Sequence, residues 1–190
     1  MTDAPPGALI IETVTTTVNA EGTVNCAAMG VEWGDEIIVI KPYRATRTLR
    51  NLQATGAAVV NLTDDILLFA QAALGDPQPP TRRADAIDGA ILADAGSWRE
   101  VTVEAIDTSG PRARVTTRVV ATGAGREFLG FNRARHAVLE ASIIASRAHL
   151  VPAAEIGAEL ARLQVLVDKT AGPREREAME LVRGHVRKTG

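Results

Sequence analysis

A short basic segment, residues 41–51, carries the residue types that bind a phosphate group. Its sequence, KPYRATRTLRN, holds four cations, two threonine hydroxyls and an amide where an expected strand gives way to an expected helix. A helix N-terminus presents free N–H groups and a positive dipole, and nearby Arg and Thr side chains strengthen its attraction for an anion. Arg44 and Thr46 lie at the expected mouth and are the better candidates. Arg47 and Arg50 also fit the solvated face of an amphipathic helix.

A second segment, NCAAMG at residues 25–30, has small side chains at the end of an expected strand. Such a strand end lets a flat ligand approach the backbone, whose N–H and C=O groups could bind heteroatoms at the edge of a ring. The same small side chains are also typical of a strand that packs closely. Cys26 fits a small buried hydrophobe better than a nucleophile, and a single cysteine cannot form an internal disulfide.

Two further segments fit a structural role as well as a binding role. NLTDD, residues 61–65, favours a helix cap, since neighbouring carboxylates at one helix start do not face each other. FNRARH, residues 131–136, could be cap and surface groups or anion contacts across a subunit boundary. The chain has no GxxxxGK[ST] motif and no strand-borne GxGxxG, so binding of nucleoside triphosphates or Rossmann-type binding of NAD has no support.

Composition excludes several other classes of protein. The 190 residues are 46% hydrophobic and 23% charged, the ratios of a soluble globular protein. Only six residues are aromatic, which disfavours stacking platforms for nucleic acid, and the net charge of −2 argues against a general polyanion binder. No apolar stretch approaches the ~18 residues of a membrane span, and no signal peptide is evident. We therefore expect a cytoplasmic protein with neither nucleic-acid nor membrane partners.

The elements that must position these residues follow from turn residues and periodicity. Strands are expected at residues 8–18, 23–29, 36–40, 57–61, 98–106 and 112–121. Helices are expected from residue 45 or 46 to 54, where Gly56 ends the first, and at 65–73 with Asp64 as N-cap, 133–146, 153–167 and 174–187. In 112–119 polar and apolar residues alternate, which predicts a strand with one wet face. Strands first and helices last indicate an α+β protein.

Four segments together resemble a family of functionally uncharacterised prokaryotic proteins that are similar to the flavin reductase group of FMN-binding split β-barrels. They are IETVTTTVNAEGTVNCAAMG (11–30), KPYRATRTLRNL (41–52), VVNLTDD (59–65) and FNRARHAVLEASIIASR (131–147). The resemblance covers nearly the whole chain. It implies a mainly antiparallel split β-barrel that binds FMN at residues 1–130, and a C-terminal helical region at 131–190 packed on the barrel. It also implies a homodimer with FMN near the subunit interface, in prokaryotes that use a methanopterin-type carrier.

Matched position by position, the resemblance implies contacts to the FMN phosphate from the R-x-T-x-T segment. Arg44, Thr46 and Thr48 would make these contacts, with Asn51 close behind them on the helix.

The same matching implies where the isoalloxazine ring would lie. Asn25, Ala27 and Ala28 would line its edge, and Asn61 would sit on the neighbouring strand. Family members often have Pro at the position of Ala28 and an aromatic residue at that of Leu49. These departures change the expected shape of the pyrimidine pocket and leave the phosphate cradle intact.

The resulting hypothesis is an FMN-binding flavoprotein that acts as an oxidoreductase with NAD(P)H or another two-electron donor. No catalytic side chain and no metal site is assigned. One alternative is a non-enzymatic carrier of a flavin or a phosphorylated pterin. Another is a purely structural dimer in which the Arg-rich strand 112–118 pairs with an acidic surface.

Overall fold

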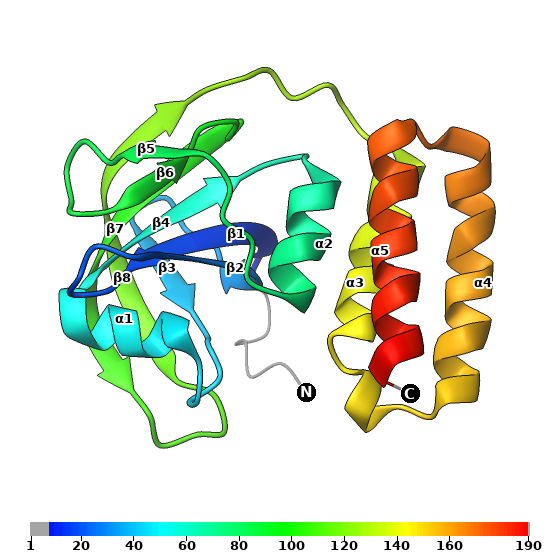
Figure 1. Ribbon diagram of the computed structural model, residues 1–190. Helices are drawn as coiled ribbons and strands as arrows, with labels where there is room; N and C mark the ends of the chain where they lie inside the picture. The colour runs from blue at the N-terminus through cyan, green and yellow to red at the C-terminus, as the bar shows by residue number, and fades with distance from the viewer. Residues whose placement is uncertain (1–7, 190) are drawn as a thin grey trace. The chain divides into compact units, whose positions relative to one another are not determined.

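The computed structural model describes residues 8–189 and divides them into two compact units. Residues 8–63 and 78–127 form a β-barrel unit, and residues 64–77 and 128–189 form a helical unit (Figure 1). Between residues 8 and 189 no helix is long and apolar enough to cross a lipid bilayer.

Six strands close the barrel, in the order β1-β2-β3-β8-β7-β4, and every neighbouring pair is antiparallel. They are β1 (Ile10–Val18), β2 (Val24–Glu32), β3 (Ile37–Ile40), β4 (Ala57–Leu62), β7 (Ser97–Asp107) and β8 (Arg114–Ala124). The strands expected from the sequence are all present, each within a few residues of its expected bounds. The predicted fold, an antiparallel barrel followed by helices, is thus confirmed.

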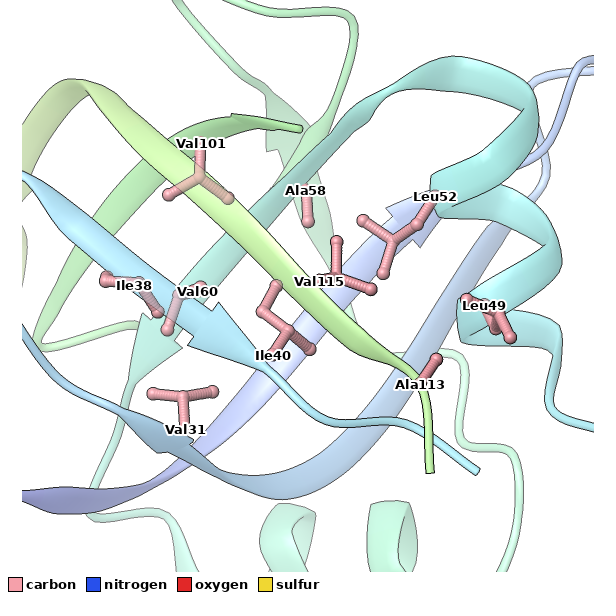
Figure 2. Close-up of a cluster of buried hydrophobic side chains, with 10 residues drawn as sticks. All are labelled: Val31, Ile38, Ile40, Leu49, Leu52, Ala58, Val60, Val101, Ala113 and Val115. Atoms are coloured by element: carbon pink, nitrogen blue, oxygen red, sulfur yellow. The ribbon is translucent and has the colours of Figure 1, made fainter. Parts of the chain in front are cut away.

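The barrel core is aliphatic, as the shortage of aromatic residues requires. Figure 2 shows Val31, Ile38, Ile40, Val101 and their neighbours pointing into one cluster of buried side chains. The alternation predicted for residues 112–119 is also confirmed: Ala113, Val115 and Thr117 are fully buried, whereas Arg112 and Arg118 are exposed.

Helix α1 (Arg47–Thr55) lies against the barrel, and its two ends lie within one or two residues of the predicted ends (Figure 1). Thr46 is its N-cap and accepts a hydrogen bond from the Leu49 N–H at 3.3 Å. Gly56 ends it with a φ of 69°, a conformation that glycine adopts without strain, and donates to the Leu52 carbonyl. Leu49 and Leu52 join the barrel core (Figure 2), so the apolar side of α1 fixes where its N-terminus lies.

A small hairpin of β5 (Thr81–Arg83) and β6 (Ala90–Leu92) was not expected from the sequence. Three residues are too few to show a period of two. The hairpin is held by the barrel instead: buried Glu100 accepts hydrogen bonds from the N–H groups of Asp85 and Ala86, at 3.0 and 2.6 Å. Thr16 donates to the Ala90 carbonyl at 2.5 Å.

The helical unit consists of α2 (Ile66–Leu74), α3 (Arg133–Ala145), α4 (Ala153–Thr170) and α5 (Pro173–Thr189), with a 3₁₀ turn at Ala148–Leu150. Although α2 follows β4 in the chain, it packs on α3 and α5. The prediction that Asp64 caps α2 is wrong by one residue. Asp65 accepts from the Leu68 N–H at 3.2 Å, and Asp64 instead pairs with Arg135 at 2.5 Å. That the helical region packs on the barrel stays a prediction.

Candidate functional site

The mouth of the candidate site is the turn between β3 and α1. Arg44 is exposed there and makes no ion pair within residues 8–189. The hydroxyl of Thr46 donates to the Tyr43 carbonyl at 2.7 Å while it accepts from Leu49, so its proton is already engaged. Thr46 therefore shapes the turn, and the groups left to receive an anion are the Arg44 guanidinium and first-turn N–H groups of the helix.

A buried cluster of hydroxyl and amide groups lies behind this mouth, where α1 meets the barrel. The hydroxyl oxygen of Thr17 accepts from Asn25 Nδ2 at 3.4 Å and from Asn51 Nδ2 at 3.1 Å. Asn25 Nδ2 also donates to the Thr48 hydroxyl at 3.2 Å. The structure thus brings three predicted site residues together, and all of them are buried. They tie α1 to β1 and β2 and so fix the position of the helix.

Thr17 belongs to this cluster but was not predicted from the sequence as a site residue. Thr13, Thr15 and Thr17 recur at every second position of β1 and are buried on one face of the strand. The sequence has threonine at these positions and at position 16, so the pattern does not single out Thr17, whose contact with Asn51 spans 34 residues.

The three remaining candidates divide between the two faces of the sheet. Ala27 and Ala28 are successive residues of β2, so their side chains point to opposite faces and only one can face a given ring. Ala28 and Asn61 both pair with Val14, which places them on one face on either side of β1.

Asn61 is fully buried, and its amide is engaged by backbone and hydroxyl groups. Nδ2 donates to the Val14 carbonyl at 3.0 Å and to the Thr16 hydroxyl at 3.1 Å, and Oδ1 accepts from the Leu92 N–H at 3.0 Å. The side chain therefore holds β6 against β1 and β4.

Ion pairs of Glu32 with Lys41 and Arg114 hold the start of the turn. Arg114 donates to both Glu32 oxygens, at 2.9 and 2.8 Å, and Lys41 Nζ lies 2.8 Å from Glu32 Oε1. Burial by itself raises the pKa of Glu32, but the contacts with Arg114 and Lys41 outweigh it and hold this pKa below its ordinary value. The hydrogen bonds to Glu32 raise the pKa of Arg114 in turn. Lys41 begins the turn that leads to Arg44, so this cluster fixes the start of the mouth.

The segment 131–136 serves the helical unit. Asn132 caps α3 by accepting from the N–H groups of Ala134 and Arg135, at 2.8 and 3.1 Å. Arg135 pairs with Asp64 and, at 2.9 Å, with Glu175. These contacts fit the prediction that residues 131–136 are cap and surface groups. Within residues 8–189 no group of three or more His, Cys, Asp or Glu side chains could hold a metal ion.

A groove of about 400 Å³ lies between α4 and α5 in the helical unit. Leu160, Val165 and Val186 form part of its wall, and Arg183 and Asp168 lie among its polar residues. None of the residues predicted to bind a cofactor lines it.

Two family models match the chain. The model described as the N-terminal domain of a protein of unknown function, DUF447, matches residues 11–126, and a second DUF447 model matches residues 132–184. Both matches agree with the family resemblance expected from the sequence.

Solved structures share the fold. A crystal structure of an FMN-bound DUF447 protein from Methanosarcina mazei has a TM-score of 0.83 at 21% identity, covering 93% of this chain and 94% of that one. An FMN-binding protein from Thermus thermophilus with bound p-hydroxybenzaldehyde has a TM-score of 0.54 at 16% identity, and the match covers 69% of this chain and 83% of that one. Nitrilotriacetate monooxygenase component B from Bacillus cereus has a TM-score of 0.52 at 16% identity, covering 66% and 82%.

Proposed function

Because the chain belongs to the DUF447 family of proteins of unknown function, we propose that it is an FMN-binding flavoprotein that acts as an oxidoreductase. The FMN-bound relative from Methanosarcina mazei, which has the same fold over nearly its full length, supports FMN as the cofactor. The residues of this chain support the same ligand at the turn before α1.

The observation that carries the proposal is the position of Arg44 before the first turn of α1. A phosphate needs donors and positive charge, and Arg44 brings both without an acidic neighbour to compete for them. Thr46 holds the turn in place. Asn51 and Asn25 donate to the Thr17 hydroxyl, and Asn25 also donates to the Thr48 hydroxyl, so these bonds fix the helix to the barrel. In this proposal the backbone at Ala27 and Ala28 borders the ring.

Bound FMN would supply two-electron transfer chemistry. The role of the chain is then to hold the phosphate at Arg44 and the helix N-terminus, and to keep the small-residue part of β2 close to the ring. Hydride transfer depends on positioning more than on proton transfer, so the proposal assigns no general acid or base. A reduced pyridine nucleotide or another two-electron donor would be the substrate, and we propose a homodimer as the assembly.

An anaerobic reduction experiment tests whether the protein is an enzyme or a carrier. FMN-loaded protein is mixed with NADH, NADPH or reduced deazaflavin, and the oxidised flavin band is followed with time. An oxidoreductase bleaches this band with at least one donor faster than free FMN does under the same conditions. Rates no faster than those of free FMN with all three donors would contradict the enzymatic proposal and favour the carrier.

A further inference from the structure

Tyr43 and Arg112 form an exposed stacked pair beside the candidate phosphate cradle. The Arg112 guanidinium carbon lies 4.1 Å from the centre of the Tyr43 ring, and Arg112 Nη2 donates to the Tyr43 hydroxyl at 2.6 Å. Arg112 is exposed, and Tyr43, the chain's single tyrosine, is 51% exposed. An exposed ring that a guanidinium holds in place offers a stacking surface for another planar group.

Backbone contacts attach this pair rigidly to the cradle. Tyr43 and Arg112 face each other in an isolated antiparallel bridge, and the Pro42 carbonyl accepts from the Ala113 N–H at 3.0 Å. The Tyr43 carbonyl also accepts from the Thr46 hydroxyl, which caps α1. A ligand on the pair would therefore lie at a fixed position relative to Arg44.

The charge around the pair is unbalanced. Residues 41–56 and 108–118, the two segments that meet here, contain no Asp or Glu. Glu32 offsets Lys41 and Arg114, and Glu104 pairs with Arg118 at 2.5 Å. By contrast, in the part of the chain that the structure describes, Arg44, Arg50 and Arg112 have no acidic partner. This surface thus has three arginines without an acidic partner, which is more than one phosphate group would require for binding.

The pair is also distinct from the side of the barrel proposed to border the flavin ring. Arg112 precedes β8, whereas Ala27, Ala28 and Asn61 lie on β2 and β4. In the barrel order, β3 separates β8 from β2, and β7 separates it from β4.

We propose that Tyr43 and Arg112 form a second nucleotide site, which takes an adenine nucleotide that carries a phosphomonoester. The purine would stack on the pair, and the free edge of the Arg112 guanidinium would bind the phosphate through charge-assisted hydrogen bonds. This binding can be measured without FMN, so it goes beyond the proposed function. Only the further step, that this nucleotide is part of the pyridine nucleotide that reduces FMN, rests on the proposed function.

Calorimetric titration with adenosine 2′,5′-bisphosphate, on FMN-free and FMN-loaded protein, tests the site. We expect binding to the unaltered protein and a loss of about 10–100-fold in Arg112→Gln, the loss expected for one charge-assisted contact. Tyr43→Ala should weaken nucleotide binding similarly, and FMN affinity should change less than about twofold in Arg112→Gln. Arg118→Gln is the matched control, because Arg118 is an exposed arginine of β8 that is paired with Glu104. Circular dichroism and the unfolding midpoint establish that each variant is folded.

Three results would overturn the proposal. The first is that the unaltered protein does not bind the bisphosphate at millimolar concentration. The second is that Arg118→Gln loses as much nucleotide affinity as Arg112→Gln. The third is that Arg112→Gln loses as much FMN affinity as nucleotide affinity. The last would make the pair part of the flavin site. Absence of FMN binding together with Arg112-dependent nucleotide binding would contradict only the proposed function.

The source of the nucleotide follows from two further titrations. If the site serves a dinucleotide reductant, NADP⁺ binds at least as tightly as the bisphosphate and NAD⁺ binds at least about tenfold more weakly. If it serves a free nucleotide, the bisphosphate binds and NADP⁺ does not. Either outcome supports the site, provided that binding is lost in Arg112→Gln.

Discussion

Arg44 is the residue whose removal most directly tests the proposed phosphate contact. It is exposed at the start of the turn before α1 and has no ion pair within the described chain. Arg44→Ala should weaken FMN binding by about 1.5–3 kcal/mol, as expected for the loss of one charge-assisted hydrogen bond. Titration of the protein with FMN, followed by flavin fluorescence, measures this change. Arg118→Ala is the control, and equal affinities of Arg44→Ala and the unaltered protein would refute the assignment.

Glu32 is expected to control how stability depends on pH. The pKa of Glu32 is lower in the folded protein than in the unfolded chain, so its contribution to stability is complete above the pKa that it has in the unfolded chain. It is lost as the pH falls through the lower, folded value. Glu32→Gln should therefore remove part of the loss of stability between neutral and acidic pH.

The same substitution should lower the free energy of unfolding at pH 7 by roughly 3 kcal/mol, because the buried Lys41 ammonium loses its counter-ion. Urea unfolding at several pH values measures both effects. The double variant Glu32→Gln/Lys41→Met should regain much of the stability at pH 7. A single variant whose stability follows that of the unaltered protein at every pH would contradict this role.

At the scale of elements, the position of α1 on the barrel depends on the Thr17 hydroxyl. Thr17→Val keeps the shape of the side chain but removes the acceptor of the Asn51 amide, and it leaves the Asn25 amide with the Thr48 hydroxyl as its acceptor. A buried group left unsatisfied costs about 1–3 kcal/mol, so we expect a loss of this size in the free energy of unfolding, together with weaker FMN binding. Thr17→Ser keeps the hydroxyl and should lose much less of both. Equal effects of the two substitutions would contradict the hydrogen-bonding role.

Local signals in the sequence predicted most of these elements. Thr46 and Gly56 have the side chain and the conformational freedom that the two ends of a helix require, and the structure uses both. The N-cap of α2 was missed by one residue because Asp64 and Asp65 are equally able to cap. An ion pair with Arg135, 71 residues away, engages Asp64 elsewhere. The β5–β6 hairpin is held by distant barrel residues such as Glu100, which leave no local pattern.

The candidate site was predicted less completely than the fold, for the same reason. Arg44 and Thr46 follow from the strand-to-helix junction, which is a local feature. The buried cluster depends on Thr17 meeting Asn51 across 34 residues of sequence. The stacking of Tyr43 on Arg112 spans 69 residues and depends on the pairing of β3 with β8. Such long-range contacts come from the closure of the barrel and cannot be read from spacing.

At the scale of the whole molecule, the helical unit is discontinuous in sequence. Its α2 comes between β4 and β5, and its buried apolar residues include Ile66, Leu67 and Phe69. Because α2 packs on α3 and α5, a chain truncated after residue 127 should expose this apolar helix and aggregate. Size-exclusion chromatography and binding of a hydrophobic dye measure the outcome beside the full chain. A soluble truncated protein that binds no dye and unfolds cooperatively would contradict this prediction.

The proposed function depends on FMN binding at the turn before α1. The most direct measurement is an equilibrium titration of FMN into the purified, flavin-free protein, run in parallel with Arg44→Ala and Arg118→Ala and followed by absorbance and flavin fluorescence. We expect saturable binding with a shifted flavin spectrum, weakened by Arg44→Ala and unchanged in Arg118→Ala. A protein that shows no spectral change and no saturable binding at any FMN concentration tested would contradict it.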